Sequence, residues 1–577
     1  MIRNVLRRVG WLVVLMMWIA AGEALEVEQV VWGFDGKPVE GCFNPVFVLV
    51  KNSGGQSFDG ALVMEEPRGG IVPSADAQTV TIPPQTARWV QFSLWASIYA
   101  SSHRLRWGHG SGESVELPFA PDFDGLARVW LRDGERFADA QGDVPVFPDR
   151  LFPKSVVATG GLDVVVLDHA PGWEPAQRAA FLDWLHRGGT VHLVKTGSGE
   201  YPVFGAGLEF LNLAVDETRF GAGRVLRHDM PGSEMSAQYL AEHGSPKRGR
   251  VEADSSVIGE LDSTLLDNLA AITRPHVNWG LIDLLAMAYI ALIGGVHFFL
   301  RKRLEYRLSI ALFLASVVIF SLALGFLGRR GYGENQIVHS LSLARSLGEG
   351  RYDVTQWINA FATDGSRYTL SHAAPANFYF SGSMRASFER NVRNGPEGRI
   401  VMEIPLYSSR SFIHQGVMTG RDTNVTVEQW ENGAEGKLHL RLRPGADFPK
   451  DFTQIQAVVG GFVYDLSLAN GVLENAQAPV SVSGVFSRDT LSSLQVGITY
   501  RSWKDQEDLQ GKLVQLLAAH AVSAPDIFRT SIAPRVETDN HLQLLVTAPS
   551  PESFNVVGQG FHREIGWTLY TQDVFKP

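Results

Sequence analysis

The sequence predicts a multidomain α+β membrane protein in which extracytoplasmic domains flank a two-helix transmembrane hairpin. Three observations predict it. Two long apolar segments, residues 279–300 and 308–328, lie near the middle of the chain. Short alternating runs typical of β-strands fill most of the remainder, and one strand–helix–strand unit lies within residues 162–197. The chain of 577 residues is also too long for one hydrophobic core.

Composition limits the partners and the redox chemistry. The formal net charge of −10 argues against nucleic acid, which needs concentrated Lys and Arg on one face. The single cysteine, Cys42, leaves no internal disulfide, so the domains must be stabilised by core burial alone. We expect Cys42 to be a small buried side chain.

The first element, residues 1–24, reads as a signal peptide. Arg3, Arg7 and Arg8 precede an apolar run, and small residues such as Gly22 and Ala24 follow it. This order of a basic, an apolar and a small-residue segment is typical of exported chains. The alternative, an uncleaved N-terminal anchor, is weaker because the apolar run barely spans a bilayer.

Residues 25–120 follow with four alternating runs separated by Gly, Pro, Ser and Asp turns. The runs are residues 46–52, 61–66, 79–84 and 88–96. Several short strands at this spacing predict an immunoglobulin-like β-sandwich.

Residues 121–277 change to an α/β pattern. A strand is predicted at 127–133, a buried strand with a polar C-terminal end at 162–172, an amphipathic helix at 174–189 and a further strand at 190–197. A buried strand, a helix and a second strand form the βαβ unit of a parallel sheet.

This part of the chain resembles a known family. The stretch D-V-V-V-L-D-H, followed by Q-R-A-A-F-L-D-W-L-H-R-G-G-T-V-H-L-V and by G-A-G-R-V at 221–225, is similar to class I glutamine-amidotransferase-like domains. It is similar to the non-catalytic versions found in large bacterial membrane proteins, where the domain lies between a β-sandwich and membrane helices. Active members use a cysteine nucleophile after the strand, where this chain has Asp168 and His169. The resemblance therefore implies a flavodoxin-like domain without catalysis, and partnership with other envelope proteins, including von Willebrand-type ones.

The hairpin, residues 278–328, has two segments that each reach roughly 30 Å at about 1.5 Å per residue, the thickness of the hydrocarbon core. Arg301, Lys302, Arg303 and Arg307 lie between them, which predicts a cytoplasmic loop and places both flanking regions outside. Asp283 and His297 lie near the segment ends, where a charged group can reach water.

Residues 329–577 are predicted to form a mainly-β extracytoplasmic domain. Residues 337–344 read as an edge or first strand, 437–443 as a half-exposed antiparallel strand, and Asn470–Gly471 as a hairpin turn. Further strands are expected at 367–372, 378–382, 399–407, 541–549 and 566–575, and one amphipathic helix at 505–520.

Three functions remain open. The first is a non-enzymatic scaffold or binding module in the envelope, with no catalytic, cofactor-binding or metal-binding residue. The second is a hydrolase with a non-cysteine active site around Asp168 and His169, with Glu200 or the pair His228–Asp229 as further candidates. The third, transport, would need more than two spans or an oligomer. The sequence favours the scaffold, located in the inner membrane with both flanking regions periplasmic.

Overall fold

The computed structural model describes most of the chain after residue 24. Described are residues 25–577 apart from 40–41, 66–74, 96–102, 109–112, 119–125, 135–136, 138–143, 206, 244–254, 274–278, 301–302, 304, 333–335, 381–389, 433–437, 476–477, 486–505, 523–539, 559 and 562. The expected signal peptide at 1–24 therefore lies outside the described residues.

The N-terminal domain consists of two antiparallel sheets that share one core. One sheet has the order β1 (Leu25–Trp32), β2 (Phe43–Asn52), β5 (Thr86–Trp95). The other has the order β4 (Ala75–Ile82), β3 (Phe58–Glu65), β6 (His103–Arg106), β7 (Ser114–Leu117). Alternate residues such as Val48, Phe92, Leu62 and Leu105 meet between the sheets. The four expected strands are all present.

The α/β domain contains a sheet with five parallel strands. Its order is β9 (Val146–Pro148), β8 (Ala127–Arg132), β10 (Leu162–Leu167), β11 (Thr190–Lys195) and β13 (Gly223–Pro231), with β12 (Glu217–Phe220) antiparallel at the edge. Helix α2 (Pro175–His186) covers one face through Phe181 and Trp184, and α3 (Ala237–His243) adds Leu240 to the other. Short 3-10 turns complete it: η1 (Asp149–Leu151), η2 (Val156–Thr159), η3 (Glu209–Asn212) and η4 (Gly232–Glu234).

Local sequence explains α2. Glu174 and Gln177 form a capping box around the first turn, with Pro175 at the first helical position. The chain leaves the helix through Gly188, whose φ of +111° is accessible to glycine and not to other residues. The expected strand, helix and strand between residues 162 and 197 are thus confirmed.

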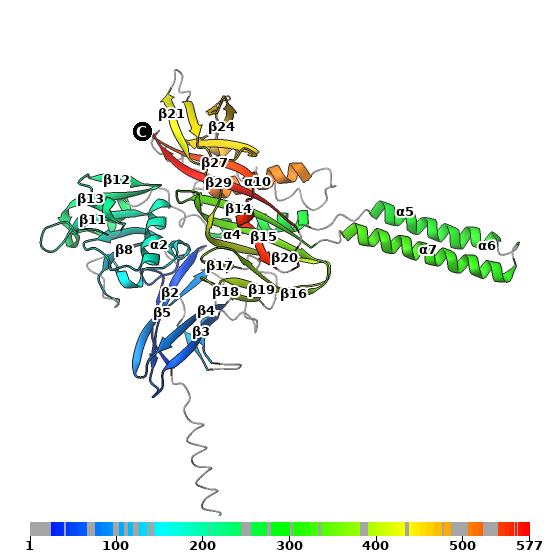
Figure 1. The fold of residues 1–577 in the computed structure, drawn as a ribbon, viewed down its shortest axis with the longest axis horizontal. Coiled ribbons are helices and arrows are strands. Elements are labelled where there is room, and N and C mark those ends of the chain that lie inside the picture. Colours follow the sequence, from blue (N-terminus) through cyan, green and yellow to red (C-terminus); the bar gives the residue numbers. More distant parts are fainter. Residues whose placement is uncertain are drawn as a thin grey trace, which may run out of the picture.

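Two helices are long and apolar enough to cross a membrane. The first is α5 (Trp279–Ile290), which continues through a π-helical turn (Ala291–Val296) into α6 (His297–Leu300). The second is α7 (Tyr306–Tyr332). Their apolar stretches, Gly280–Phe299 and Tyr306–Gly325, have mean hydropathies of 1.9 and 2.5. Figure 1 shows the two helices side by side, projecting away from the body of the molecule.

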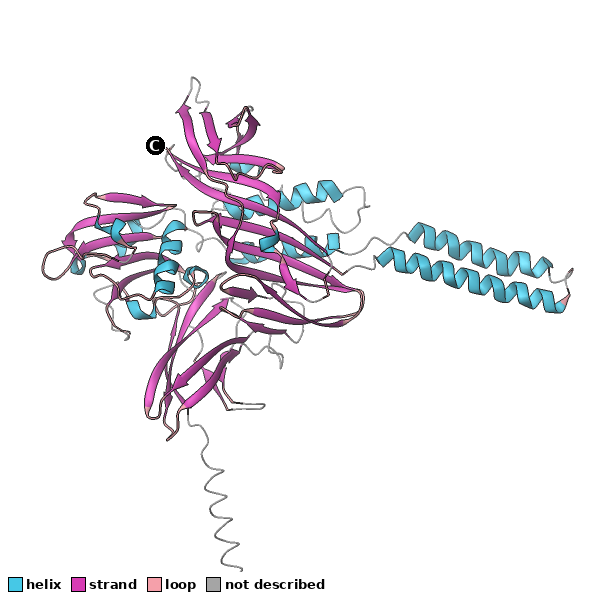
Figure 2. Ribbon diagram, in the orientation of Figure 1, coloured by secondary structure: helices cyan, strands magenta, loops and turns pink. Residues whose placement is uncertain are grey.

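The C-terminal domain is built on a 12-stranded sheet. Its strand order is β17 (Asn377–Phe380), β20 (Ser408–Thr419), β15 (Arg351–Ala362), β14 (Ile337–Ser346), β29 (Arg563–Phe575), β27 (His541–Pro549), β23 (Gln454–Val459), β24 (Phe462–Ala469), β25 (Val472–Asn475), β22 (Leu438–Pro444) and β21 (Val425–Asn432), with β26 (Val480–Ser481) beside β24. A second sheet has the order β18 (Arg390–Arg393), β19 (Arg399–Ile404), β16 (Ser366–His372), β28 (Val556–Gly558). Helices α8 (Val482–Val485) and α10 (Gln506–Val522) and the turn η10 (Glu552–Phe554) complete the domain, which Figure 2 shows to be mostly sheet.

Most local predictions for this domain are confirmed. Strand β22 alternates buried leucines with exposed polar residues and pairs antiparallel with β21. Asn470 and Gly471 join β24 to β25, with φ values of +53° and +78°, as a two-residue turn of this type requires. The expected helix at 505–520 is α10, and Leu513, Leu516 and Leu517 are buried against the sheet.

Residues 337–344 lie in β14, which is the first strand after the hairpin as expected, but the alternative that they form an edge strand is wrong. Strand β14 lies in the centre of the long sheet, between β15 and β29. Its polar residues are buried with its apolar ones, among them Ser340 and Ser342 at 0% exposure. An alternating pattern usually means that one face of a strand is exposed. In β14 both faces are buried, because one packs in an apolar core and the other belongs to a buried polar network.

Helix α4 (Ser255–Thr273) differs from the expected domain boundary. The sequence prediction assigned residues 121–277 to the α/β domain, whereas α4 packs on the C-terminal sheet. Leu265, Leu266 and Leu269 share a core with residues of β14, β15 and α10. The Trp357 indole N–H donates to Asp262 Oδ1 at 2.9 Å, which holds the helix on the sheet. The α/β domain therefore ends before α4.

Candidate functional site

The carboxyl ends of β8, β9 and β10 hold the polar network that the sequence pointed to. Strand β8 pairs with β9, the next strand in the chain, on one side and with β10 on the other side. The strand order thus reverses between β8 and β10, the point where open α/β sheets bind ligands. Asp133 follows β8, Asp149 follows β9, and Asp168 and His169 follow β10.

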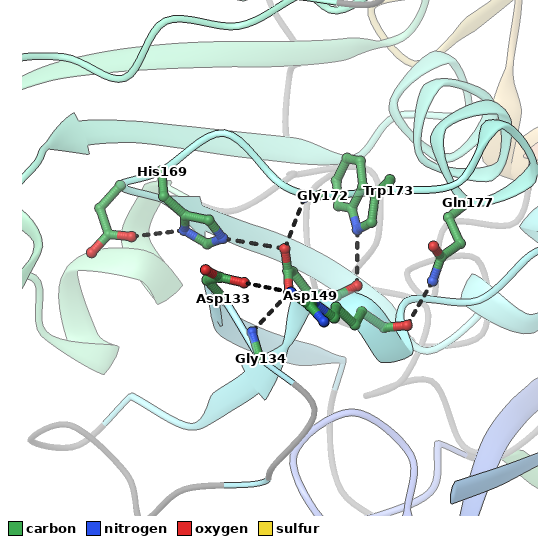
Figure 3. A network of polar contacts seen from close by, with 9 residues as sticks. Asp133, Gly134, Asp149, His169, Gly172, Trp173 and Gln177 are labelled. Carbon is green, nitrogen blue, oxygen red and sulfur yellow. Dashed lines mark hydrogen bonds and ion pairs between the residues drawn. The ribbon is translucent and has the colours of Figure 1, made fainter.

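His169 lies between two carboxylates (Figure 3). Its Nδ1 is 3.0 Å from Asp168 Oδ1 and its Nε2 is 3.5 Å from Asp149 Oδ2. The longer contact is an ion pair and exceeds an ordinary hydrogen-bond distance. Asp149, which is 0% exposed, also accepts the backbone N–H groups of Gly134 at 3.2 Å and Gly172 at 3.1 Å.

Electrostatics keep this histidine charged. Burial by itself lowers the pKa of His169, but the hydrogen bonds and charges of Asp149 and Asp168 outweigh it and raise that pKa to about 9. Burial likewise acts to raise the pKa values of Asp149 and Asp168, but their contacts with His169 lower both overall. An imidazolium paired with two carboxylates does not itself act as a general base at neutral pH. The contacts of His169 and Asp149 link the loops that follow β8, β9 and β10, and we call this arrangement the His169 clamp.

The other predicted residues are not part of this network. Glu200 is exposed in the turn after β11. His228 and Asp229 point to opposite faces of β13, as neighbours on a strand must. His228 Nε2 lies 2.9 Å from the buried His192 Nδ1, whereas Asp229 forms an exposed ion pair with Lys195.

Cys42, Asp283 and His297 are also elsewhere. Cys42 is half-buried, and a Cβ on Gly160 would lie 2.8 Å from its Cβ. Gly160 precedes β10, so Cys42 lies at the amino end of that strand, opposite Asp168. In the hairpin, Asp283 is exposed, and the ring of His297 lies 5.4 Å from that of Phe313.

Two buried histidine clusters were missed by the sequence reasoning. In the α/β domain, burial and the charge of His228 lower the pKa of His192 to about 3. In the C-terminal domain, His372 and His414 stack with ring centroids 3.7 Å apart. Within the described residues, no group of three or more His, Cys, Asp or Glu side chains could hold a metal ion.

The junction between the α/β and C-terminal domains carries a second charged network. Arg187, at the end of α2, donates to Asp353 Oδ2 at 2.7 Å, and Arg351 donates to Asp183 Oδ2 at 2.7 Å. Asp353 is 0% exposed and also accepts from Gln415 at 3.1 Å. Burial alone would raise the pKa of Asp353, but the charges of Arg187 and Arg345 lower it overall, so the carboxylate stays ionised.

An aromatic cluster joins the sandwich to the C-terminal domain. The ring of Phe43 lies 5.2 Å from that of Trp95 and 5.4 Å from that of Phe378, and Trp95 stacks on Phe380 at 4.8 Å. Parts of the chain before and after the hairpin therefore form one body through both polar and apolar contacts.

The His169 clamp should make the stability of the α/β domain depend on pH. Its folded pKa of about 9 lies above the unfolded value of about 6.5. Its stabilisation is therefore complete below pH 6.5 and lost as the pH rises through 9. We expect His169→Gln to lower the unfolding free energy by about 1–2 kcal/mol at pH 6.5, after allowance for partial exposure, and by much less at pH 10. Thermal unfolding of both proteins between pH 6 and 10 measures this, and a pH-independent difference would contradict it.

Comparison with known proteins gives no family. No family model and no curated protein matches the chain. Among solved structures, three alignments have TM-scores below 0.2 and carry no argument about fold or function. The Fcho1 mu homology domain of Danio rerio with a bound Eps15 peptide is 7% identical, with 41% of this chain and 94% of that chain covered and a TM-score of 0.18. A bacterial ice-binding adhesin is 6% identical, with coverages of 96% and 97% and a TM-score of 0.11. A Paenibacillus sp. cycloisomaltooligosaccharide glucanotransferase is 7% identical, with coverages of 79% and 98% and a TM-score of 0.14.

Proposed function

We propose that this chain is a non-enzymatic, membrane-anchored envelope protein whose extracytoplasmic domains form a scaffold for other envelope proteins. The observation that carries the proposal is the buried ion pair between Arg187 and Asp353, which joins the regions before and after the hairpin. A scaffold must hold its binding surfaces in fixed relative positions. Buried charge pairs favour one such arrangement, because any other leaves a desolvated charge without its partner.

The α/β domain supports the same proposal. Its parallel strands follow the order 2-1-3-4-5, which is the flavodoxin-like order and is compatible with a class I amidotransferase-like domain. The residues at its switch point form the His169 clamp, which links three loops and keeps its imidazole protonated at neutral pH. We infer that this domain contributes shape and surface rather than chemistry.

The hairpin supports the anchor. Its two helices have the length and hydropathy of membrane spans, and their apolar side chains are exposed, for example Leu284 at 61% and Leu322 at 68%. Such a surface is unfavourable in water and suits lipid. We propose that the helices cross the inner membrane, with the basic loop cytoplasmic and both flanking regions periplasmic.

Affinity purification of the tagged full-length protein from detergent-solubilised membranes tests the scaffold. After mild crosslinking, we expect stoichiometric envelope proteins to copurify. Asp168→Asn, which removes the charge beside His169, should leave that set unchanged because the clamp is structural. A solitary protein that carries a bound small molecule or metal, and loses it in Asp168→Asn, would reject the scaffold and favour a hydrolase.

A further inference from the structure

Four chain segments meet at one end of the C-terminal sheet. Ile337, the first residue of β14, is in register with Phe361 of β15 and with Arg563 of β29. Phe361 is in turn in register with Ser409 of β20. The end where the chain arrives from α7 therefore also carries the β15–β16 turn and the β19–β20 turn. The two turns are in contact at Gly365 and Leu406. A Cβ atom added to Gly365 would lie only 2.8 Å from the backbone N of Leu406.

The connections to the hairpin keep this end of the sheet near the membrane helices. Helix α7 ends at Tyr332 and β14 begins at Ile337, a step that spans at most roughly 17 Å at about 3.4 Å per residue. Helix α4 ends at Thr273 and α5 begins at Trp279. Thr273 Oγ1 lies 3.1 Å from His339 Nδ1, so both connections start from the same place. Figure 1 shows the β16–β20 end of the domain turned to the side from which the hairpin projects.

The β19–β20 turn presents two large apolar side chains at this end. Leu406 is 63% exposed and Tyr407 is 45% exposed. Tyr407 also has a φ of +50°, a left-handed conformation that glycine or asparagine adopts at lower cost than an aromatic residue. Two neighbouring large apolar side chains this exposed are unfavourable in water, which directs attention to a contact outside the chain.

We propose that the Leu406–Tyr407 turn inserts into the bilayer surface around the hairpin and orients the extracytoplasmic body on the membrane. The inference rests on the proposed membrane anchoring. Tyrosine suits the interface between lipid chains and headgroups, because its ring is apolar and its hydroxyl reaches water. Beside the turn, the exposed Arg367 and Glu403 stand opposite each other in register, so the local charge is balanced. The contact is therefore apolar insertion and not attraction to anionic lipid.

Fluorescence quenching in vesicles tests the insertion. In a Cys42→Ser background, the full-length chain carries one cysteine at a time, labelled with an environment-sensitive fluorophore. It is reconstituted into phosphatidylethanolamine–phosphatidylglycerol vesicles that contain nitroxide-labelled acyl chains. We expect at least a twofold loss of emission for Leu406→Cys, unchanged by high salt. The matched control is Val203→Cys, because Val203 is 82% exposed and belongs to the α/β domain, away from the hairpin, and should lose less than a tenth.

A third label separates the failure of this inference from that of the anchor. Leu314, near the middle of the apolar stretch Tyr306–Gly325 of α7, is 57% exposed and should be quenched if the hairpin crosses the bilayer. If Leu314→Cys is quenched and Leu406→Cys is not, insertion of the turn is overturned and the anchor stands. If neither is quenched, both fail. If the label at 406 responds only after other envelope proteins are added, the turn is a protein contact and the inference is overturned.

Discussion

Asp353→Ala is expected to destabilise the folded body outside the hairpin by about 3–5 kcal/mol, because it leaves Arg187 buried without its counter-charge. The carboxylate is 0% exposed, and the side chain of Arg187 is only 13% exposed. Little water can therefore replace the lost partner. Urea unfolding of the full-length protein in detergent, followed by limited proteolysis, measures the loss. The first new cleavage sites should appear between the α/β and C-terminal domains.

Two controls identify the cause of that effect. Glu116→Gln removes a carboxylate that pairs with Arg104 on the surface of the sandwich, and it should leave the unfolding midpoint unchanged. The double variant Arg187→Met with Asp353→Leu removes both buried charges and should recover most of the stability that Asp353→Ala loses. If the double variant is as unstable as the single one, the junction depends on packing and not on the ion pair.

Local sequence patterns predicted the elements of this protein well. The run of apolar residues in β10, the capping box and Gly188 around α2, and the Asn470–Gly471 turn each determine the structure of a few neighbouring residues. The hairpin was equally readable, because its helices are apolar on every side for the length of a bilayer. In each case the physical cause lies within one element.

Long-range pairing could not be predicted in this way. The central position of β14 depends on parallel pairing with β29, which lies more than two hundred residues further along the chain. Helix α4 has an ordinary amphipathic pattern, and nothing local says that it packs on strands beyond the hairpin. Likewise Arg187 and Asp353 lie in unrelated segments and carry no shared motif.

The polar network at the switch point was predicted in part. Asp168 and His169 were identified because they follow the apolar run of a buried strand. Asp149 was missed, although it also directly follows a short strand, β9. Its role depends on the order of strands, because only a sheet with β8 between β9 and β10 brings Asp149 to His169. The strand order therefore determines which carboxylates surround His169.

A second large effect is expected in acid, where the C-terminal domain should lose stability as the pH falls from 6.5 toward 3. His372 and His414 stack on each other inside the sheet, where burial lowers the pKa of His372 to about 3 and that of His414 well below its usual range. A folded pKa below the unfolded value of about 6.5 means that the stabilisation is complete above pH 6.5 and disappears in acid. For His372 alone the loss amounts to roughly 4 kcal/mol.

Glu564 opposes this trend without reversing it. Burial raises the pKa of Glu564 to about 7, so its contribution to the free energy of unfolding becomes more favourable as the pH falls from 7 toward 4.5. The stability gained from this one carboxyl is smaller than the stability lost from the two stacked histidines. His339 adds to the loss, because burial lowers the pKa of His339 to about 4. Below pH 4.5, Glu564 is protonated in the folded and unfolded states alike and adds nothing further. The decline with acid should therefore be steepest between about pH 4.5 and 4, where Glu564 offsets it least and His339 is still largely unprotonated in the folded state.

Urea midpoints measured from pH 7.5 to 3.5 decide the matter. The wild-type midpoint should fall with acid, and His414→Gln, which keeps a hydrogen-bonding group between Gln356 and Asn377, should show a shallower fall. His439→Gln, on the exposed face of β22, is the matched control and should follow the wild-type curve. A wild-type midpoint that stays constant to pH 3.5 would mean that the buried rings gain a proton without unfolding. The hydrogen bonds from His414 to two amide oxygens would then hold an imidazolium inside the sheet, because only a doubly protonated ring can donate to both.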